Sequence, residues 1–183
     1  MLLDRLLLLS LPTSSKTVAP QQEVASLPSL VLVNPAATPP VVALALAIVG
    51  QESSADAQAL NPHSGALGLA QVMPANLKEW SQDILGYRLT PEEFLKSPEL
   101  QSKIIYHKLS EYWQEALADS DGDEKLAVLR VASYWYSGNP NLYTSTAPQS
   151  YRGKDGQLYP YPSVAEYSNS VLKKYREYRG GKT

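Results

Sequence analysis

The stretch from Ile48 to Pro74 reads IVGQESSADAQALNPHSGALGLAQVMP, and it places one acidic residue, Glu52, between an apolar segment and a polar loop. Nine apolar residues, Val41 to Val49, precede this glutamate, and a loop rich in Asn, Ser and Gly follows it. A carboxylate at the edge of an apolar core costs free energy, so its presence calls for a functional explanation.

The apolar segment predicts a buried helix over residues 41–53. A buried strand is the competing interpretation, but the length of the run and its Ala and Leu content favour a helix. The segment is apolar all round, which is typical of a central helix rather than a surface helix. Thr38 is expected to cap it, with Pro39 or Pro40 in the first turn, where no amide donor is needed.

In such a helix Glu52 lies on the same stripe as Val41, Ala45 and Ile48 and emerges at the C-terminal end. Burial beside apolar side chains and the negative end of the helix dipole both disfavour the carboxylate, so both raise its pKa. A carboxyl group that holds a proton near neutral pH can act as a general acid. The alternative is an exposed glutamate at a helix end, without a role.

The composition excludes several classes of protein. The chain has 183 residues, enough for one domain with a core. Its 16 basic and 18 acidic residues give a formal net charge of −2, so no basic surface for nucleic acid is expected. The apolar run before Glu52 is far too short to span a membrane, so no membrane span is expected.

No metal or cofactor is expected. The chain has no cysteine, and its two histidines, His63 and His107, are too few for most zinc sites. The acidic run DSDGDE, which begins at Asp119, resembles a calcium loop, but Arg130 stands where its twelfth-position acid belongs. We interpret this run as a solvated connection between helices, and His63 as a loop residue lining the cleft.

Residues 1–38 differ from the rest and are interpreted as an extended, Pro- and Ser-rich arm with one short strand-like run, residues 30–33. A segment of this composition becomes ordered only when something outside it holds it, so we expect protein partners to bind here. The first twelve residues are a poor signal peptide, because Asp4 stands in the region that should be basic.

Residues 39–183 are interpreted as one mainly α domain. Further helices are expected near residues 74–85, 91–96, 98–117, 123–137 and 164–179, with Gly- and Tyr-rich connections between them. Pro74, Pro91 and Pro98 each stand where a helix would begin.

The loop after the glutamate carries a specific combination of residues. The matching positions are Glu52-Ser53, Asn61, Gly65, Gly68, Leu69, Gln71, Val72, Met73 and Pro74. This pattern resembles the soluble lytic transglycosylase catalytic domain, a lysozyme-like fold related to goose-type lysozyme. The resemblance covers about residues 40–178 and implies that Glu52 is catalytic.

Two later stretches resemble the same family with departures. VASYWYSGNP stands where the family has Ala-Tyr-Asn-Ala-Gly-Pro, and either Trp135 or Tyr134 takes the tyrosine position; aligned on Gly138, Tyr136 replaces the asparagine. YPSVAEYSNSVLKKY resembles the closing turn and helix, with Ser163-Val164 in place of Glu-Thr.

The resemblance implies a substrate and a reaction. The substrate is the β-1,4 bond between N-acetylmuramic acid and N-acetylglucosamine in peptidoglycan, and the product is a 1,6-anhydro sugar formed by one glutamate acting as acid and base. The residues expected to line the glycan cleft are Ser53, Gly68, Gln71, Met73, Tyr134, Trp135 and Tyr136. A hydrolytic muramidase stays open, with Asp56 as the candidate second carboxylate.

The arm suggests a place for this activity. We expect a wall-cleaving subunit of a larger assembly such as a phage tail, carried by the virion rather than secreted by a signal peptide, and acting in the periplasm or cell wall. A structural subunit that keeps the fold without turnover is the remaining alternative.

Overall fold

Six helices and one antiparallel hairpin make up residues 38–153 and 156–180, the part of the chain that the computed structural model describes. In chain order they are α1 (Pro40–Glu52), α2 (Pro74–Leu85), α3 (Pro91–Lys96), α4 (Pro98–Ala118), α5 (Glu124–Ser137), β1 (Gln149–Arg152), β2 (Leu158–Tyr161) and α6 (Val164–Tyr178). The expected mainly α fold is confirmed. The strand-like run at 30–33 and nearly all of the arm lie outside the described residues.

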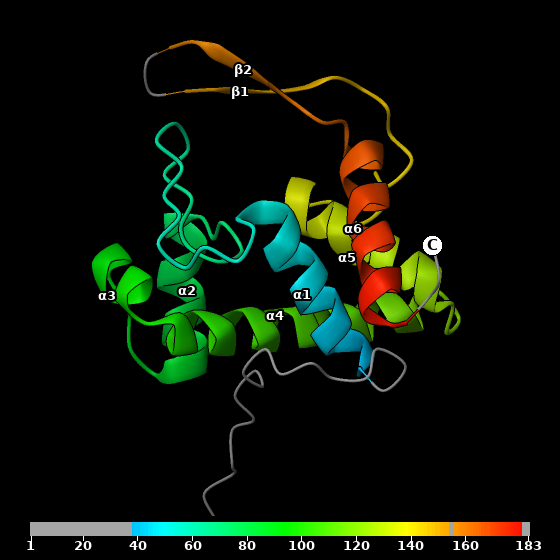
Figure 1. Ribbon diagram of the computed structural model, residues 1–183, viewed down its shortest axis with the longest axis horizontal. Helices are drawn as coiled ribbons and strands as arrows, with labels where there is room; N and C mark the ends of the chain where they lie inside the picture. Colours follow the sequence, from blue (N-terminus) through cyan, green and yellow to red (C-terminus); the bar gives the residue numbers. More distant parts are fainter. Residues whose placement is uncertain (1–37, 154–155, 181–183) are drawn as a thin grey trace, which may run out of the picture.

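The long helix α4 runs along the base of the molecule, and the other helices are arranged on it (Figure 1). It packs against α1, α5, α2 and α3, while α6 packs against α5 and α1. The loop that follows α1 rises on one side, and the hairpin of β1 and β2 lies across the top (Figure 1). This arrangement places the C-terminal end of α1 below the hairpin.

Local signals explain why the helix starts agree with the expected ones. The helices α1, α2, α3 and α4 each have a proline at their start, where its missing amide donor is not needed. A capping box of Thr90 and Glu93 begins α3, and a second one of Ser163 and Glu166 begins α6. These interactions span three residues, so the sequence alone contains them.

The expected cap at Thr38 is wrong. The N-cap of α1 is Pro39, and no side chain caps it. Thr38 is buried, and its carbonyl oxygen instead accepts a hydrogen bond of 2.6 Å from Nη1 of Arg179. A tertiary contact with the end of α6 therefore replaces the expected local cap.

The hairpin was not expected from the sequence. Its strands pair in antiparallel register, with Gln149 opposite Tyr161 and Arg152 opposite Leu158. Each strand has only four residues, and a strand of that length gives a weak periodic signal.

The core lies between α1, α4, α5 and α6, where α1 packs against α4 and α6 and α5 packs against the same two helices. The largest fully buried side chains are Phe94, Leu44, Ile48, Leu67, Leu77, Ile104, Ile105, Leu109, Gln101, Val72, Val128 and Val131. Six of the thirteen residues of α1 are buried and the other seven are half-buried, so no side of this apolar helix is fully exposed. Among residues 38–153 and 156–180, no helix combines the length and apolar character needed to cross a membrane.

The acidic run between α4 and α5 is an exposed connection, as expected. Asp119 forms an ion pair of 2.9 Å with Arg130, and the side chain of Asp123 accepts a hydrogen bond of 3.0 Å from the amide of Leu126 at the start of α5. Asp123 thus caps the start of α5, and Asp119 joins the end of α4 to the middle of α5.

Candidate active site

Glu52 is the last residue of α1, and its side chain is partly buried between α1 and α6. Its Oε1 accepts a hydrogen bond from the hydroxyl of Tyr167, which lies 115 residues further along the chain on α6. Tyr167 itself is 4% exposed, so the hydroxyl has a fixed position. The carboxyl group is therefore held in one orientation by a rigid donor.

Burial raises the pKa of Glu52 from its ordinary value of 4.5 to about 7, although the hydrogen bond from Tyr167 acts in the opposite direction. Burial and the nearby Glu52 charge raise the pKa of Tyr167 well above its usual range, so this hydroxyl keeps its proton and remains a donor. A carboxyl group with a pKa about 7 can both give and take a proton near neutral pH.

A second tyrosine lies against the first. The rings of Tyr136 and Tyr167 are stacked with centroids 4.3 Å apart and an angle of 11° between their planes. The hydroxyl of Tyr136 donates a hydrogen bond of 2.8 Å to the carbonyl oxygen of Pro162. Burial, followed by the charge of Glu52, raises the pKa of Tyr136 to about 12. Two protonated tyrosines thus form one wall beside Glu52.

The residue before the glutamate fixes α1 against α6. Oε1 of Gln51 accepts hydrogen bonds of 2.7 Å from the hydroxyl of Ser170 and 2.7 Å from the ammonium group of Lys174. Ser170 lies one turn beyond Tyr167 on α6, so this network sets the register between the two helices. It thereby keeps Tyr167 opposite Glu52.

The loop after α1 returns to the site through Ser53. The Ser53 hydroxyl donates a hydrogen bond of 2.7 Å to the carbonyl oxygen of Leu69, and Leu67 exchanges two backbone hydrogen bonds of 2.9 Å with Val72. An isolated bridge also joins Leu67 to Leu60. The loop is therefore a small, ordered structure whose two ends are tied together beside Glu52.

Gly68 is the point where this loop touches α4. Its φ is +65°, in the left-handed region that favours glycine, and a Cβ atom here would lie 2.2 Å from Oε1 of Gln101. No other residue type fits without displacing Gln101.

Gln101 is a fully buried polar residue that the sequence analysis did not identify. Its Oε1 accepts a hydrogen bond of 2.8 Å from the amide of Leu69, and its Nε2 donates to the carbonyl oxygens of Ala57 and Phe94, both at 2.9 Å. One side chain of α4 thus satisfies three backbone groups and joins the loop to α3.

Two residues expected to touch substrate lie at the end of the loop. The side-chain amide of Gln71 donates to the carbonyl oxygen of Gly68 at 3.2 Å, so its nitrogen is turned into the loop. Met73 is 40% exposed at the N-cap of α2. Both residues line a pocket at this end of the loop.

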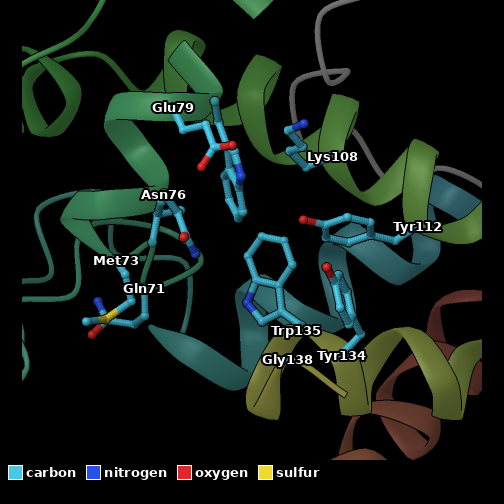
Figure 2. Close-up of a pocket in the computed structure, with 11 residues that line it drawn as sticks. Gln71, Met73, Asn76, Glu79, Lys108, Tyr112, Tyr134, Trp135 and Gly138 are labelled. Carbon is cyan, nitrogen blue, oxygen red and sulfur yellow. The ribbon is translucent and has the colours of Figure 1, made fainter. Parts of the chain in front are cut away.

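The pocket has a volume of about 420 Å³ and lies between the loop and three helices. Its lining residues are Gln71, Val72, Met73, Asn76, Glu79, Trp80, Lys108, Tyr112, Tyr134, Trp135 and Gly138. Figure 2 shows Trp135 in the middle of this set, with Tyr112 and Tyr134 on one side of it and Asn76 on the other. Aromatic faces with amide and charged groups around them suit a sugar chain.

Three consecutive residues at the end of α5 divide between these two regions. Tyr134 and Trp135 line the pocket. The ring centroids of Trp135 and Trp80 are 5.6 Å apart, and those of Tyr134 and Tyr112, which meet edge-on, are 4.7 Å apart. Tyr136 instead faces Tyr167, which binds Glu52. The Trp135 indole also donates a 3.3 Å hydrogen bond to the carbonyl oxygen of Ala70.

The structure thus brings most of the predicted site residues to two adjoining places. Ser53 and Tyr136 lie beside Glu52, Gly68 is in the loop wall, and the pocket contains Gln71, Met73, Tyr134 and Trp135. Tyr167 and Gln101 were not among the site residues expected from the sequence. The first could have been found only as the tyrosine of the closing helix, and the second had no sequence signal.

Comparison with known families agrees with this geometry. The family model described as the Transglycosylase SLT domain matches residues 38–134, more than half of the chain. The chain belongs to this family. SLT domains are lysozyme-like lytic transglycosylases that act on peptidoglycan, which lies outside the cytoplasm. Neither a curated protein nor a solved structure matches the chain. The SLT match ends at residue 134, so Tyr136, the hairpin and Tyr167 lie beyond it.

Proposed function

We propose that this SLT domain cleaves the bond between N-acetylmuramic acid and N-acetylglucosamine with Glu52 as its single acid and base. The observation that carries the proposal is the environment of Glu52, where burial raises its pKa to about 7 and Tyr167 orients it. A glutamate in this state supplies a proton and takes one back within the same pH range.

The reaction needs no other group from the chain to balance. Glu52 gives its proton to the leaving glycosidic oxygen as the bond to C1 of the muramic residue breaks. The substrate's N-acetyl group stabilises the positive charge at C1, and the carboxylate of Glu52 then takes the proton of the muramic 6-hydroxyl as that oxygen bonds to C1. The tyrosine wall of Tyr136 and Tyr167 keeps its protons throughout, because both pKa values lie far above neutral.

In this proposal the binding surface is the pocket, whose lining residues Tyr134 and Trp135 directly precede Tyr136 of the tyrosine wall; Glu52 itself is not among the lining residues. Trp80, Trp135 and Tyr112 offer ring faces for sugar rings, and Gln71 and Asn76 offer amides for N-acetyl groups. We propose that two or more sugar residues of the strand lie here, with the scissile bond at Glu52.

A hydrolytic muramidase is the alternative enzyme, and it needs a second carboxylate or another group to activate water. The candidate from the sequence, Asp56, is exposed, and its Oδ1 accepts a hydrogen bond of 2.8 Å from the amide of Gln58 in the turn after α1. This engagement in the loop favours transglycosylation over hydrolysis.

Digestion of purified peptidoglycan tests the proposal. The wild type is expected to release products that lack one water at the muramic end, and Glu52→Gln is expected to release none. Glu115→Gln, which removes an exposed carboxylate on α4, serves as the matched control and should act like the wild type. Glu52-dependent products with ordinary reducing ends would mean a muramidase, and no products from any variant would favour a structural subunit.

We also infer that the domain works within a larger assembly, such as a phage tail, through partners of residues 1–38. The composition of this arm is the whole support for that inference. Capture experiments with the full chain and with a chain lacking residues 1–37 test it. Binding of wall-associated or virion proteins that depends on the arm is the expected result, and equal binding by both chains contradicts it.

A further inference from the structure

The strand β2 presents alternate residues to two different surroundings. Tyr159 and Tyr161 lie on its less exposed face, whereas Leu158 and Pro160 point to solvent. The two tyrosines are therefore on the face that meets the rest of the domain. The hairpin lies across the top of both the loop after α1 and the start of α6 (Figure 1).

One end of this strand touches the tip of the loop that follows Glu52. The rings of His63 and Tyr159 lie 3.8 Å apart, with 33° between their planes. His63 is held at the tip because Oδ1 of Asn61 accepts hydrogen bonds of 3.0 Å from the amides of His63 and Ser64. This contact joins the loop after α1 to the strand β2.

The other end reaches the tyrosine wall. The carbonyl oxygen of Pro162 accepts the hydrogen bond from Tyr136, and Tyr161 is close enough to Tyr136 to affect its ionisation. Tyr136 in turn stacks on Tyr167, which binds Glu52. The residue that follows β2 thus binds Tyr136, and the ring of Tyr136 stacks on Tyr167, the tyrosine that orients Glu52.

Together these contacts form a closed circuit of chain segments and side-chain contacts that includes Glu52. The chain runs from Glu52 to His63, the ring contact leads to Tyr159, the chain continues to Tyr167, and a hydrogen bond returns to Glu52. The segment Tyr159–Pro162, which we name the strap, covers about 10 Å between its two contacts at about 3.3 Å for each residue. A substrate groove that is open to solvent along its whole length has no chain segment crossing over it.

We propose that the strap closes the glycan cleft above Glu52, so that the enzyme takes glycan strands by their ends and not along their length. This inference rests on the proposed function, because it concerns which part of the peptidoglycan strand reaches Glu52. A strand whose neighbouring sugars continue in both directions cannot pass under the strap sideways. A strand end can enter beneath it.

Glycan strands freed of their stem peptides test the inference through the sizes of the first products. The wild type is expected to release short anhydro-ended units from the start, while the average length of the remaining strands falls slowly. His63→Ala removes the ring contact without touching Glu52 or the Asn61 turn. It is expected to shift the first products to a broad range of lengths, with rapid shortening of the strands.

Two further variants complete the comparison. Tyr159→Ala opens the same contact from the other side and is expected to give the same shift. Tyr87→Ala removes a 52% exposed tyrosine between α2 and α3, far along the chain from the strap, and should keep the wild-type product pattern. Early mid-strand cleavage by the wild type overturns the inference, as does an unchanged pattern in both opened variants. Loss of all cleavage in both, with folding intact, also overturns it.

A locked strap provides the opposite test. The natural chain has no cysteine, so His63→Cys combined with Tyr159→Cys offers a single pair for a short thiol-specific crosslinker. The crosslinked enzyme is expected to keep releasing units from strand ends, and inactivity that reverses when the crosslinker is cleaved overturns the inference. If the wild type makes no Glu52-dependent product, the proposed function fails instead, and the two failures are thereby distinguished.

Discussion

The raised pKa of Glu52 makes a quantitative prediction about folding stability. Between pH 4.5 and about 7 the folded protein keeps a proton on Glu52 that the unfolded chain has already lost. Because the folded state then binds more protons than the unfolded state, the free energy of unfolding falls as the pH rises through this window. The pKa of Glu52 rises from 4.5 to about 7, and each unit corresponds to about 1.4 kcal/mol, so the free energy of unfolding is expected to fall by about 3 kcal/mol across this window.

Glu52→Gln removes this dependence, because an amide of nearly the same shape does not titrate and can still accept from Tyr167. The stability of the variant relative to the wild type is therefore expected to increase by about 3 kcal/mol as the pH rises through the window, and then to stay constant. All other ionisable groups are common to both chains and cancel in the difference.

Urea unfolding of both proteins at intervals from about pH 4 to about pH 8 measures this difference. Glu115→Gln, which removes an exposed carboxylate of α4, is the control for the general effect of losing one carboxylate. A constant difference for Glu52→Gln would refute the reasoning, since it would mean that Glu52 loses its proton at the same pH in the folded and unfolded states.

Two other substitutions test the surroundings of the glutamate. Tyr167→Phe removes a hydrogen bond that lowers the pKa of Glu52, so the alkaline limb of the pH–rate profile should move to higher pH. The plateau rate should also fall about tenfold, because the carboxyl group of Glu52 loses the donor that orients it. An unmoved limb would contradict this. Gly68→Ala forces a Cβ atom against Gln101 at positive φ and is expected to cost about 2 kcal/mol or more in urea unfolding. Gly86→Ala, at φ +82° with no neighbour within 4 Å, measures the backbone strain alone and should cost less.

The helices could be predicted from the sequence because their signals are local. Prolines at the first turn and side-chain caps that reach three residues fixed the starts of α2, α3 and α4 as expected. The expected cap at Thr38 was wrong for the opposite reason: its hydrogen-bond partner, Arg179, lies near the other end of the chain, so no local signal contains this contact. The hairpin escaped prediction because its strands are only four residues long and depend on pairing with each other.

For the candidate site, the sequence by itself determined Glu52 at the end of an apolar helix and the Gly- and Gln-containing loop behind it. Only the tertiary structure decided what surrounds them. Tyr167 and Gln101 meet their partners across 115 and 32 residues, and such contacts depend on how α6 and α4 pack against α1 and its loop. The directions of Tyr134, Trp135 and Tyr136 were also undecided in the sequence, because neighbouring helical residues point about 100° apart and only packing sets which of them faces Glu52.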